Sequence, residues 1–315
     1  MSGELGVRSY EPDDRPAWDD LVRRSRAPHF MLTRGYFEYH ADRFPDASLL
    51  VFEGSALLAA LPASRSEDTI SSHGGLTFGG LVTDKRMTAE RMLATLEAVR
   101  AHYAAAGARR LIYKPVPAIY HRTPAGEDLY ALFRAGARLY RRDLSATVEL
   151  GDRLPYSKGR KAQVKRARDR YTVARELDFT EFWRIEEEAL WQRHGLRPVH
   201  TLAEISLLAG RFPDELKLFC ARGADGAVAG GVVVFETPMV AHAQYIASTE
   251  AGMAEGATDA VLDHLLGDVY ADRRYFDFGI STEQDGMVLN GGLARNKESY
   301  GARATVYDFY ELSVA

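Results

Sequence analysis

The chain has 315 residues, of which 46% are hydrophobic and 27% charged, with a formal net charge of −4. These values are typical of a folded globular protein and exclude an intrinsically disordered chain. The acidic balance argues against a generally nucleic-acid-binding surface. At roughly 150 residues per domain, the length suggests two domains.

Cysteine usage and the longest apolar runs exclude further classes of protein. The single cysteine, Cys220, cannot form an internal disulfide, and no zinc-ligand spacing is present, so we expect no metal. The N-terminus has no signal segment, and no apolar run approaches the ~18 residues of a membrane helix. We therefore expect a cytoplasmic protein without a membrane span.

The first half of the chain alternates short strands with helices. Either of two consecutive acids, Asp13 and Asp14, is suited to cap a helix that carries Trp18, Leu21 and Val22 on one face. We expect strands at 7–10, 47–52, 56–63, 109–114 and 137–150, further helices at 33–43, 88–106 and 127–135, and a glycine-rich loop at 71–81.

The second half has a similar order of elements. Thr201 and Glu204 form a capping-box pattern at the start of one of its helices. We expect helices at 158–170, 180–193, 201–210, 257–270 and 287–298, and strands at 171–177, 216–221, 227–235, 240–247, 275–278 and 306–312.

Short sequence matches also relate the two halves. The run of five residues that begins at Arg109 aligns with the run from Arg273 at an offset of 164 (273 − 109). The Gly-Ala-Arg run from Gly136 aligns with that from Gly301 at an offset of 165 (301 − 136). Chance is an alternative for such short runs, but the shared order of elements favours a duplicated α/β domain.

The last forty residues carry the most specific motif. The strand at 275–278 ends in Phe276-Asp-Phe-Gly279, and Lys297-Glu-Ser-Tyr-Gly301 follows. Ligands of α/β folds bind at such C-terminal strand ends. These motifs and the order of elements resemble the GNAT acyltransferase fold. Two such units in tandem resemble the Fem family of peptidoglycan aminoacyltransferases and their CoA-using relatives.

The resemblance implies an α/β fold with two tandem GNAT-like domains, each a mixed central sheet flanked by helices. Residues 1–150 would form a degenerate N-terminal domain on the acceptor side, and residues 151–315 the catalytic domain. The activity implied is transfer of an acyl group, with acetyl expected, from acyl-CoA to the amine of a small polar acceptor such as an amino sugar or sugar nucleotide. The alternatives are an aminoacyl-tRNA-dependent Fem-like aminoacyltransferase and a non-catalytic GNAT-like binding module.

The resemblance leaves the acyl donor open. Simple GNAT enzymes bind the CoA pyrophosphate on a glycine-rich loop at a helix N-terminus. The corresponding segment here, 250–257, supplies turns at Gly252 and Gly256 but begins with Glu250 in place of a basic or amide residue. Fem-type enzymes take their acyl group from aminoacyl-tRNA instead. The helix at 158–170, with seven basic residues and one acid, is either a surface for phosphates of CoA or tRNA or a solvated charged face.

Acyl transfer to an amine requires a proton acceptor and donors for the developing oxyanion. Strand alternation at 240–246 places His242 and Gln244 on one face and Tyr245 on the other. An imidazole is a suitable proton acceptor, Gln244 a candidate to hold the thioester oxygen, and Tyr245 a candidate donor to the leaving group. Glu283, after the strand end, is the best carboxylate candidate for a base or for recognition of the substrate amine. A purely structural role is the alternative for each.

Candidate substrate-binding residues lie mainly near the same strand end. Asp277 lies within an apolar strand, where an unpaired carboxylate is costly, so it needs a partner that Lys297 or Arg295 could supply. Lys297 is also suited to bind an anionic substrate group. Ser281 and, in the glycine-rich loop, His73 complete the set. No Ser-His-Asp elbow or Walker loop is present, so a hydrolase or a kinase is not expected.

Overall fold

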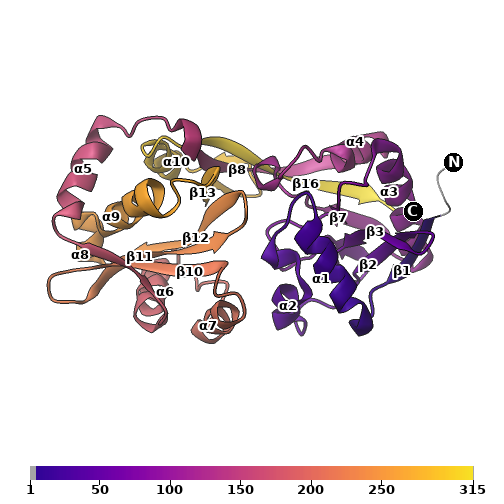
Figure 1. Cartoon of the computed structure of the whole chain (residues 1–315), viewed down its shortest axis with the longest axis horizontal. Coiled ribbons are helices and arrows are strands. Elements are labelled where there is room, and N and C mark those ends of the chain that lie inside the picture. The colour runs from indigo at the N-terminus through magenta and orange to yellow at the C-terminus, as the bar shows by residue number, and fades with distance from the viewer. Residues whose placement is uncertain (1–4, 315) are drawn as a thin grey trace. The chain divides into compact units, whose positions relative to one another are not determined.

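The structure is a computed structural model that describes residues 5–314. The chain forms two compact units (Figure 1). The first unit comprises the chain up to Asp143, Thr282–Val288 and the stretch from Val306, and the second comprises Leu144–Ser281 and Leu289–Thr305. Each unit contains residues from both halves of the sequence, because β8 (Arg138–Glu149) and β16 (Arg303–Ser313) each contribute to both.

The strands of the first unit fall into two groups. One sheet has the order β1-β2-β3-β6, and the other group runs β4-β5-β7-β16. The strands expected at 47–52 and 56–63 pair as the antiparallel hairpin β2–β3, and β5 runs parallel to β7. The bounds are β1 (Leu5–Ser9), β2 (Leu49–Glu53), β3 (Ala56–Leu61), β4 (Ser64–Ser66), β5 (Thr69–Ser71), β6 (Val82–Thr83) and β7 (Arg110–Tyr113).

Helices cover these strands with the faces that the sequence predicts. In α1 the buried residues are Trp18, Leu21 and Val22, as expected. In α3, Leu96 and Val99 belong to the same apolar core as the strands of the hairpin. The bounds are α1 (Arg15–Arg24), α2 (Arg34–Phe37), α3 (Ala89–Ala105) and α4 (Glu127–Arg134).

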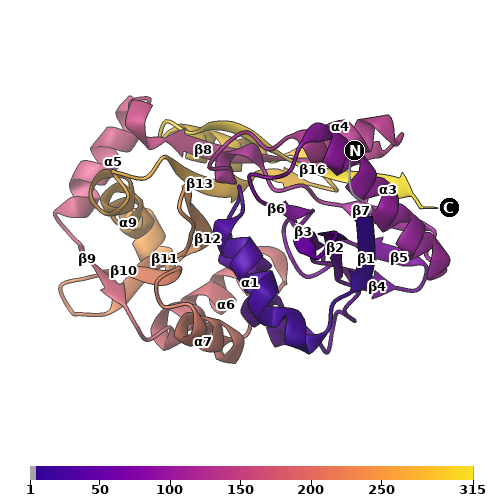
Figure 2. The same ribbon diagram turned by 45° about the vertical axis from the view of Figure 1, so that its right-hand side comes forward.

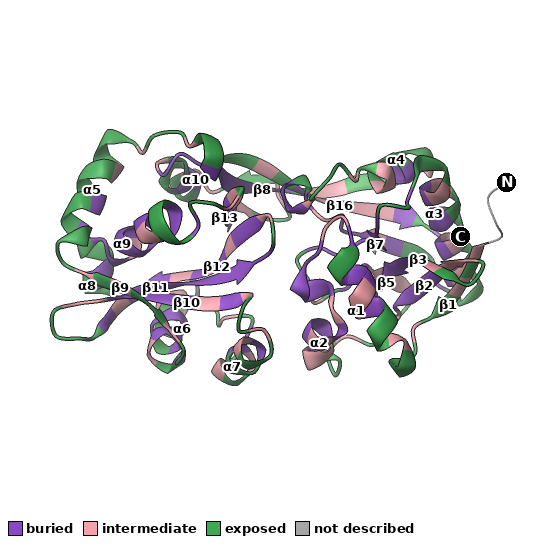
Figure 3. Cartoon of the chain, viewed as in Figure 1, coloured by how far each residue is buried: buried purple, intermediate pink, exposed green. Residues whose placement is uncertain are grey.

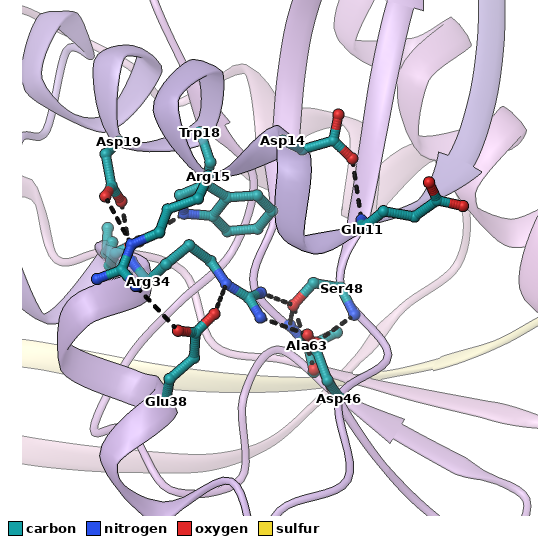
Figure 4. A network of polar contacts seen from close by, with 11 residues as sticks. Glu11, Asp14, Arg15, Trp18, Asp19, Arg34, Glu38, Asp46, Ser48 and Ala63 are labelled. Carbon is teal, nitrogen blue, oxygen red and sulfur yellow. Dashed lines mark hydrogen bonds and ion pairs between the residues drawn. The ribbon is translucent and has the colours of Figure 1, made fainter.

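The prediction of a single helix at 33–43 is wrong. The chain forms the short α2, then a 3-10 turn at Glu38–His40. This segment contains Gly35 and several aromatic residues, which are weak helix formers, so side-chain packing decides its path. The side chain of Arg34 lies in the interior of this region, in a network of polar contacts described in the Discussion (Figure 4).

The second unit is built on one continuous sheet with the order β8-β13-β12-β11-β10-β9. Only β12 and β13 run parallel; the other described pairs in this sheet are antiparallel. The bounds are β9 (Thr172–Glu176), β10 (Leu216–Arg222), β11 (Val228–Glu236), β12 (Val240–Ser248) and β13 (Tyr275–Ile280).

Helices cover both faces of this sheet. Figures 1 and 2 show α9 against one face and α6 and α7 against the other, in agreement with the contacts of each helix with the strands. The strands between these layers are mostly buried (Figure 3). The predicted capping box at Thr201 and Glu204 is confirmed. The bounds are α5 (Lys158–Arg168), α6 (Thr180–His194), α7 (Leu202–Arg211), α8 (Glu250–Glu255), α9 (Ala257–His264) and α10 (Gly291–Glu298).

Two expected helices have different bounds. The helix expected at 257–270 ends with a π-helical turn at Leu265–Val269. The helix expected at 287–298 is shortened to α10, because a small hairpin of β14 (Thr282–Glu283) and β15 (Val288–Leu289) precedes it. Positive φ angles at three consecutive residues, 284–286, form the turn of that hairpin and exclude a helix there. No helix among residues 5–314 combines the length and the apolar character that a membrane crossing requires.

Candidate active site

The parallel strands β12 and β13 pair only at their beginning. The last pair of the ladder is His242 with Asp277, although β12 continues to Ser248 and β13 to Ile280. Beyond this pair the described strands no longer share a ladder, so the edge of β12 that faced β13 is left for another hydrogen-bonding partner. The end of the ladder therefore marks an opening in the sheet.

A buried carboxylate lies at this opening. Asp277 is fully buried, and its Oδ2 lies 2.7 Å from Nδ1 of His242. Two hydroxyls from β8 donate to Oδ1, Ser145 at 2.6 Å and Thr147 at 3.0 Å. The observed ion-pair partner of Asp277 is thus His242, in place of Lys297 or Arg295 as expected. The sheet supplies the stabilising contacts directly, because all four residues come from adjacent strands.

This arrangement orients the imidazole of His242. When Nδ1 carries the hydrogen that Asp277 accepts, the lone pair resides on Nε2. The side chain is 16% exposed, and within residues 5–314 its ring makes no other hydrogen bond. Nε2 is therefore available to accept a proton from a bound molecule, and the carboxylate stabilises the imidazolium that would form.

A β-bulge changes which residues share a face of β12. The register between β11 and β12 shifts so that Gln244 has no partner residue, and its side chain is half-buried. Ala243 and Ile246 both pack in the core on the α9 side, so His242 and Tyr245 lie together on the α6 side. The expectation that Tyr245 lies opposite His242 is wrong, because simple alternation ignores the extra residue of the bulge.

Tyr245 is paired with a histidine that sequence reasoning did not include among the site residues. Its hydroxyl lies 2.5 Å from Nδ1 of His200, and both side chains are buried. The ring of Trp183 on α6 packs edge-on against Tyr245 at 5.0 Å. The only sequence signal for His200 was its place directly before the helix cap at Thr201.

Lys297 secures the end of β13. Its Nζ donates to the carbonyl oxygens of Gly279 at 2.8 Å and Ile280 at 2.6 Å. Burial lowers the pKa of Lys297 to about 8, although the charge of Asp277 acts in the opposite direction. Ser281, one residue further on, is 2% exposed, and its Oγ has no hydrogen-bond partner in the described chain.

The structure does not bring the remaining candidates into this group. Arg295 is exposed on α10, and Glu283 is exposed on β14, in the first unit. His73 also belongs to the first unit, where it is buried beside the rings of Phe37 and Phe44. Burial, with the nearby charges of His40 and Lys114, lowers the pKa of His73 to about 3.

The segment that resembles a pyrophosphate loop has an unexpected conformation. Gly252 lies inside the short helix α8, where a loop was expected, and only Gly256 has a turn conformation, with φ +85°. A Cβ at Gly252 would lie 2.1 Å from the carbonyl oxygen of Ala229, so close packing requires glycine there. In the first turn of α9, Asp259 accepts hydrogen bonds from Arg160 and from Tyr300. An internal carboxylate thus already faces the helix N-terminus.

Among its described residues, the first unit has no counterpart of the His242–Asp277 pair. Its parallel pair β5–β7 corresponds to β12–β13, and the offset of 164 places Tyr113 at the position of Asp277 (277 − 164). The Tyr113 hydroxyl donates to Asp128 and accepts from the Leu81 amide.

A lysine of the first unit ties the glycine-rich loop to the end of β7. Lys114 donates through Nζ to the carbonyls of His73 and Leu76. The loop 72–81 therefore occupies the place after β5 where the second unit has its opening.

Among residues 5–314, no three His, Cys, Asp or Glu side chains are grouped to hold a metal ion.

Comparisons with known proteins agree with this fold. Residues 157–285 match the family model described as "Acetyltransferase (GNAT) domain". The fold is similar to the crystal structure of FemX, with a TM-score of 0.70 at 11% identity over 96% of each chain. It is also similar to L-PGS from Bacillus licheniformis, with a TM-score of 0.63 at 13% identity over 99% of this chain and 93% of that one.

A tandem GNAT protein from the clavulanic acid biosynthesis pathway is similar as well, with a TM-score of 0.52 at 13% identity over 99% of both chains. A sequence search of curated proteins finds no match. The predictions of an α/β tandem GNAT-like fold, of a Fem-like resemblance and of an acyltransferase are confirmed.

Proposed function

From the match of residues 157–285 to the family model "Acetyltransferase (GNAT) domain", we propose that the chain transfers an acyl group to the amine of a small polar acceptor, with His242 as the general base. The observation that carries the proposal is the His242–Asp277 pair at the end of the β12–β13 ladder. A buried, hydrogen-bonded carboxylate behind an imidazole is the arrangement that keeps a histidine ready to accept a proton.

In the proposed reaction the acceptor nitrogen attacks the carbonyl carbon of the acyl donor. A C–N bond forms, the amine proton passes to Nε2 of His242, and Asp277 stabilises the imidazolium. Collapse of the tetrahedral intermediate breaks the bond to the carrier, which leaves with a proton. The Gln244 amide is suited to donate to the oxyanion, and the Tyr245 hydroxyl to supply the proton of the leaving group.

We propose acyl-CoA, with acetyl-CoA first, as the donor. Its pantetheine arm carries two amide groups, which match the edge of β12 left without a ladder partner beyond His242. The acceptor proposed is an amino sugar or sugar nucleotide, for which Ser281 offers a hydroxyl without a hydrogen-bond partner among residues 5–314.

An aminoacyl-tRNA donor is the second candidate, and two observations favour it. Asp259 and Glu250 place acidic groups where a CoA pyrophosphate would approach α9. In addition, Lys158, Lys161 and Lys165 are exposed along α5 at helical spacing and make no ion pair with described residues. Such a stripe fits a phosphate backbone, whose binding weakens steeply with salt.

The donor is tested by thermal midpoints of the purified chain with acetyl-CoA, free CoA and bulk tRNA. A ligand that binds only the native state raises the midpoint by mass action. A shift with acetyl-CoA supports the CoA donor. A salt-sensitive shift with tRNA alone, lost when the three lysines become Gln, supports the aminoacyl-tRNA donor. No shift with any of these ligands would favour the non-catalytic binding module.

The base is tested by His242→Gln in an acyl-transfer assay with the donor so identified and a panel of amino sugars. We expect turnover to fall by roughly 10²-fold or more, with donor binding retained, because only proton transfer is removed. Full activity of this variant would exclude His242 as the base.

A further inference from the structure

A second polar group lies between α6 and β12, apart from the His242–Asp277 pair. Glu186 on α6 is 8% exposed, and its carboxylate makes no hydrogen bond or ion pair with any side chain that the structure describes, which leaves out His194 of the same helix. Trp183, one turn earlier, is 1% exposed, and its Nε1 has no hydrogen-bond partner in the described chain. Residues three apart on a helix are neighbours, so a buried indole N–H and a largely buried carboxylate, neither with a described partner, follow each other on one face of α6.

Folded proteins rarely leave such groups unsatisfied. Nearly all buried polar atoms have a hydrogen-bond partner, and a buried carboxylate without a cation is more costly than a neutral group. Burial raises the pKa of Glu186 to about 7, against the opposing charge of Arg193. A positively charged ligand would remove this cost, because it supplies both the charge and the donors that the carboxylate lacks.

The two groups belong to the face of the sheet that carries His242. The Trp183 ring contacts Tyr245, which lies three residues after His242 on the same side of β12. At 3.3 Å per residue, the two strand positions are about 10 Å apart. A substrate about 10 Å long would therefore span the distance from the Trp183 region to the proposed base.

We propose that Glu186 and Trp183 form a subsite for an ammonium-bearing group of the substrate. The Glu186 carboxylate accepts hydrogen bonds from the ammonium, and the Trp183 indole N–H donates to a neighbouring oxygen of the same molecule. The inference rests on the proposed acyl transfer and adds a substrate requirement to it. The ammonium belongs either to a second amine of the acceptor, distinct from the one that reacts beside His242, or to the α-amino group of an aminoacyl donor, which share this chemistry.

Binding of small probes, followed by NMR titration of the full chain, tests the subsite without any need for turnover. The charged probes are n-butylamine, which represents an amine acceptor, and alanine methyl ester, which represents an aminoacyl group. Their neutral counterparts are butanol and methyl propionate. We expect wild-type protein to bind the charged probes in preference to the neutral ones. Tighter binding of the ester than of the amine would assign the subsite to an aminoacyl donor. Tighter binding of the amine would assign it to the acceptor.

The variants are Glu186→Gln, Trp183→Phe and the control Glu187→Gln, which changes an exposed acid on the same helix. We expect Glu186→Gln to weaken binding of both charged probes about tenfold or more, the effect of losing a charged hydrogen bond. Trp183→Phe keeps an aromatic ring but removes the indole N–H, so it should weaken binding of the oxygen-bearing ester only. Glu187→Gln should bind both probes as wild type does. Failure of wild type to bind either charged probe, or equal binding by Glu186→Gln, would overturn the subsite.

A stability measurement separates a ligand site from a structural role. Without ligand, Glu186→Gln should have a thermal midpoint equal to or above that of wild type, because the change removes an unpaired buried carboxylate. A clearly lower midpoint would show that Glu186 stabilises the fold and would also overturn the proposal. His242→Gln should retain probe binding, so failure of the base assignment and failure of this subsite give different results.

Discussion

Asp277 lies 2.7 Å from Nδ1 of His242 through its Oδ2, although 35 residues separate the two in the chain. The contact exists because β12 and β13 run parallel and place the two residues in register. The other carboxylate oxygen is held by hydroxyls of β8. Three adjacent strands thus fix both the position and the orientation of the imidazole.

The Asp277→Asn variant tests this positioning role. Asparagine keeps the size of the side chain but removes the charge that stabilises the imidazolium and favours the hydrogen on Nδ1. We expect kcat to fall by roughly 10²–10⁴-fold while KM for the donor changes little. The imidazole tautomer, observed by ¹⁵N NMR of His242, should shift from the form with hydrogen on Nδ1. An unchanged tautomer together with unchanged kcat would refute the role.

Glu283→Gln tests the alternative base that the sequence suggests. Glu283 is exposed on β14, which belongs to the first unit, whereas His242 belongs to the second. We expect this variant to lose less than tenfold in turnover, whereas His242→Gln loses at least the roughly 10²-fold typical of a general base. The two variants are compared in one acyl-transfer assay. The reverse order of effects would make Glu283 the base.

Lys114 gives the first unit a specific pH dependence of stability. Burial lowers its pKa from 10.5 to about 7, so between these values the unfolded chain binds more protons than the folded chain. Stability therefore rises with pH across that window, by at most roughly 1.4 kcal/mol per pH unit. Urea unfolding at pH 7.5, 8.5 and 9.5 measures the rise.

The Lys114→Met variant should lose this rise, because it has no amine to titrate. Lys165→Met serves as the control, since Lys165 is exposed on α5. Lys297 titrates in the same range but is unchanged in both variants, so its contribution cancels in the comparison with wild type. A wild-type slope that persists in Lys114→Met would contradict the assignment.

Arg34 holds a buried polar network in the first unit (Figure 4). Its guanidinium, 3% exposed, donates to Glu38 at 2.7 Å, to Asp46 at 2.5 Å and to Ser48 at 3.2 Å. It also lies 3.6 Å from the centre of the Tyr10 ring. The network joins α2 to the segment that enters β2.

The Arg34→Met variant should lower the free energy of unfolding by about 3 kcal/mol, since it leaves Asp46 without its cation and removes one of the two cations of Glu38, which keeps Arg15. The exposed pair of Arg23 with Asp20 provides the control, and Arg23→Met should cost less than about 1 kcal/mol. Chemical denaturation of the three proteins measures both values. Equal losses in the two variants would show that burial of Arg34 has no special effect.

Local patterns in the sequence were enough for the order of elements and for part of the site. The β2–β3 hairpin, the cap at Thr201 and the buried face of α1 follow from neighbouring residues. The need of Asp277 for a polar partner could also be predicted, because a carboxylate within an apolar strand is costly to bury without one. The tandem resemblance also follows, because it rests on element order and short motifs.

Tertiary structure alone decided which groups meet. The pairing of His242 with Asp277 depends on strand order, and the face of Tyr245 depends on a bulge that residue alternation does not reveal. The burial of Glu186 depends on the packing of α6 against β12. Periodicity encodes the conformation of each segment, whereas the site is made by contacts between segments distant in the chain, which no single segment encodes.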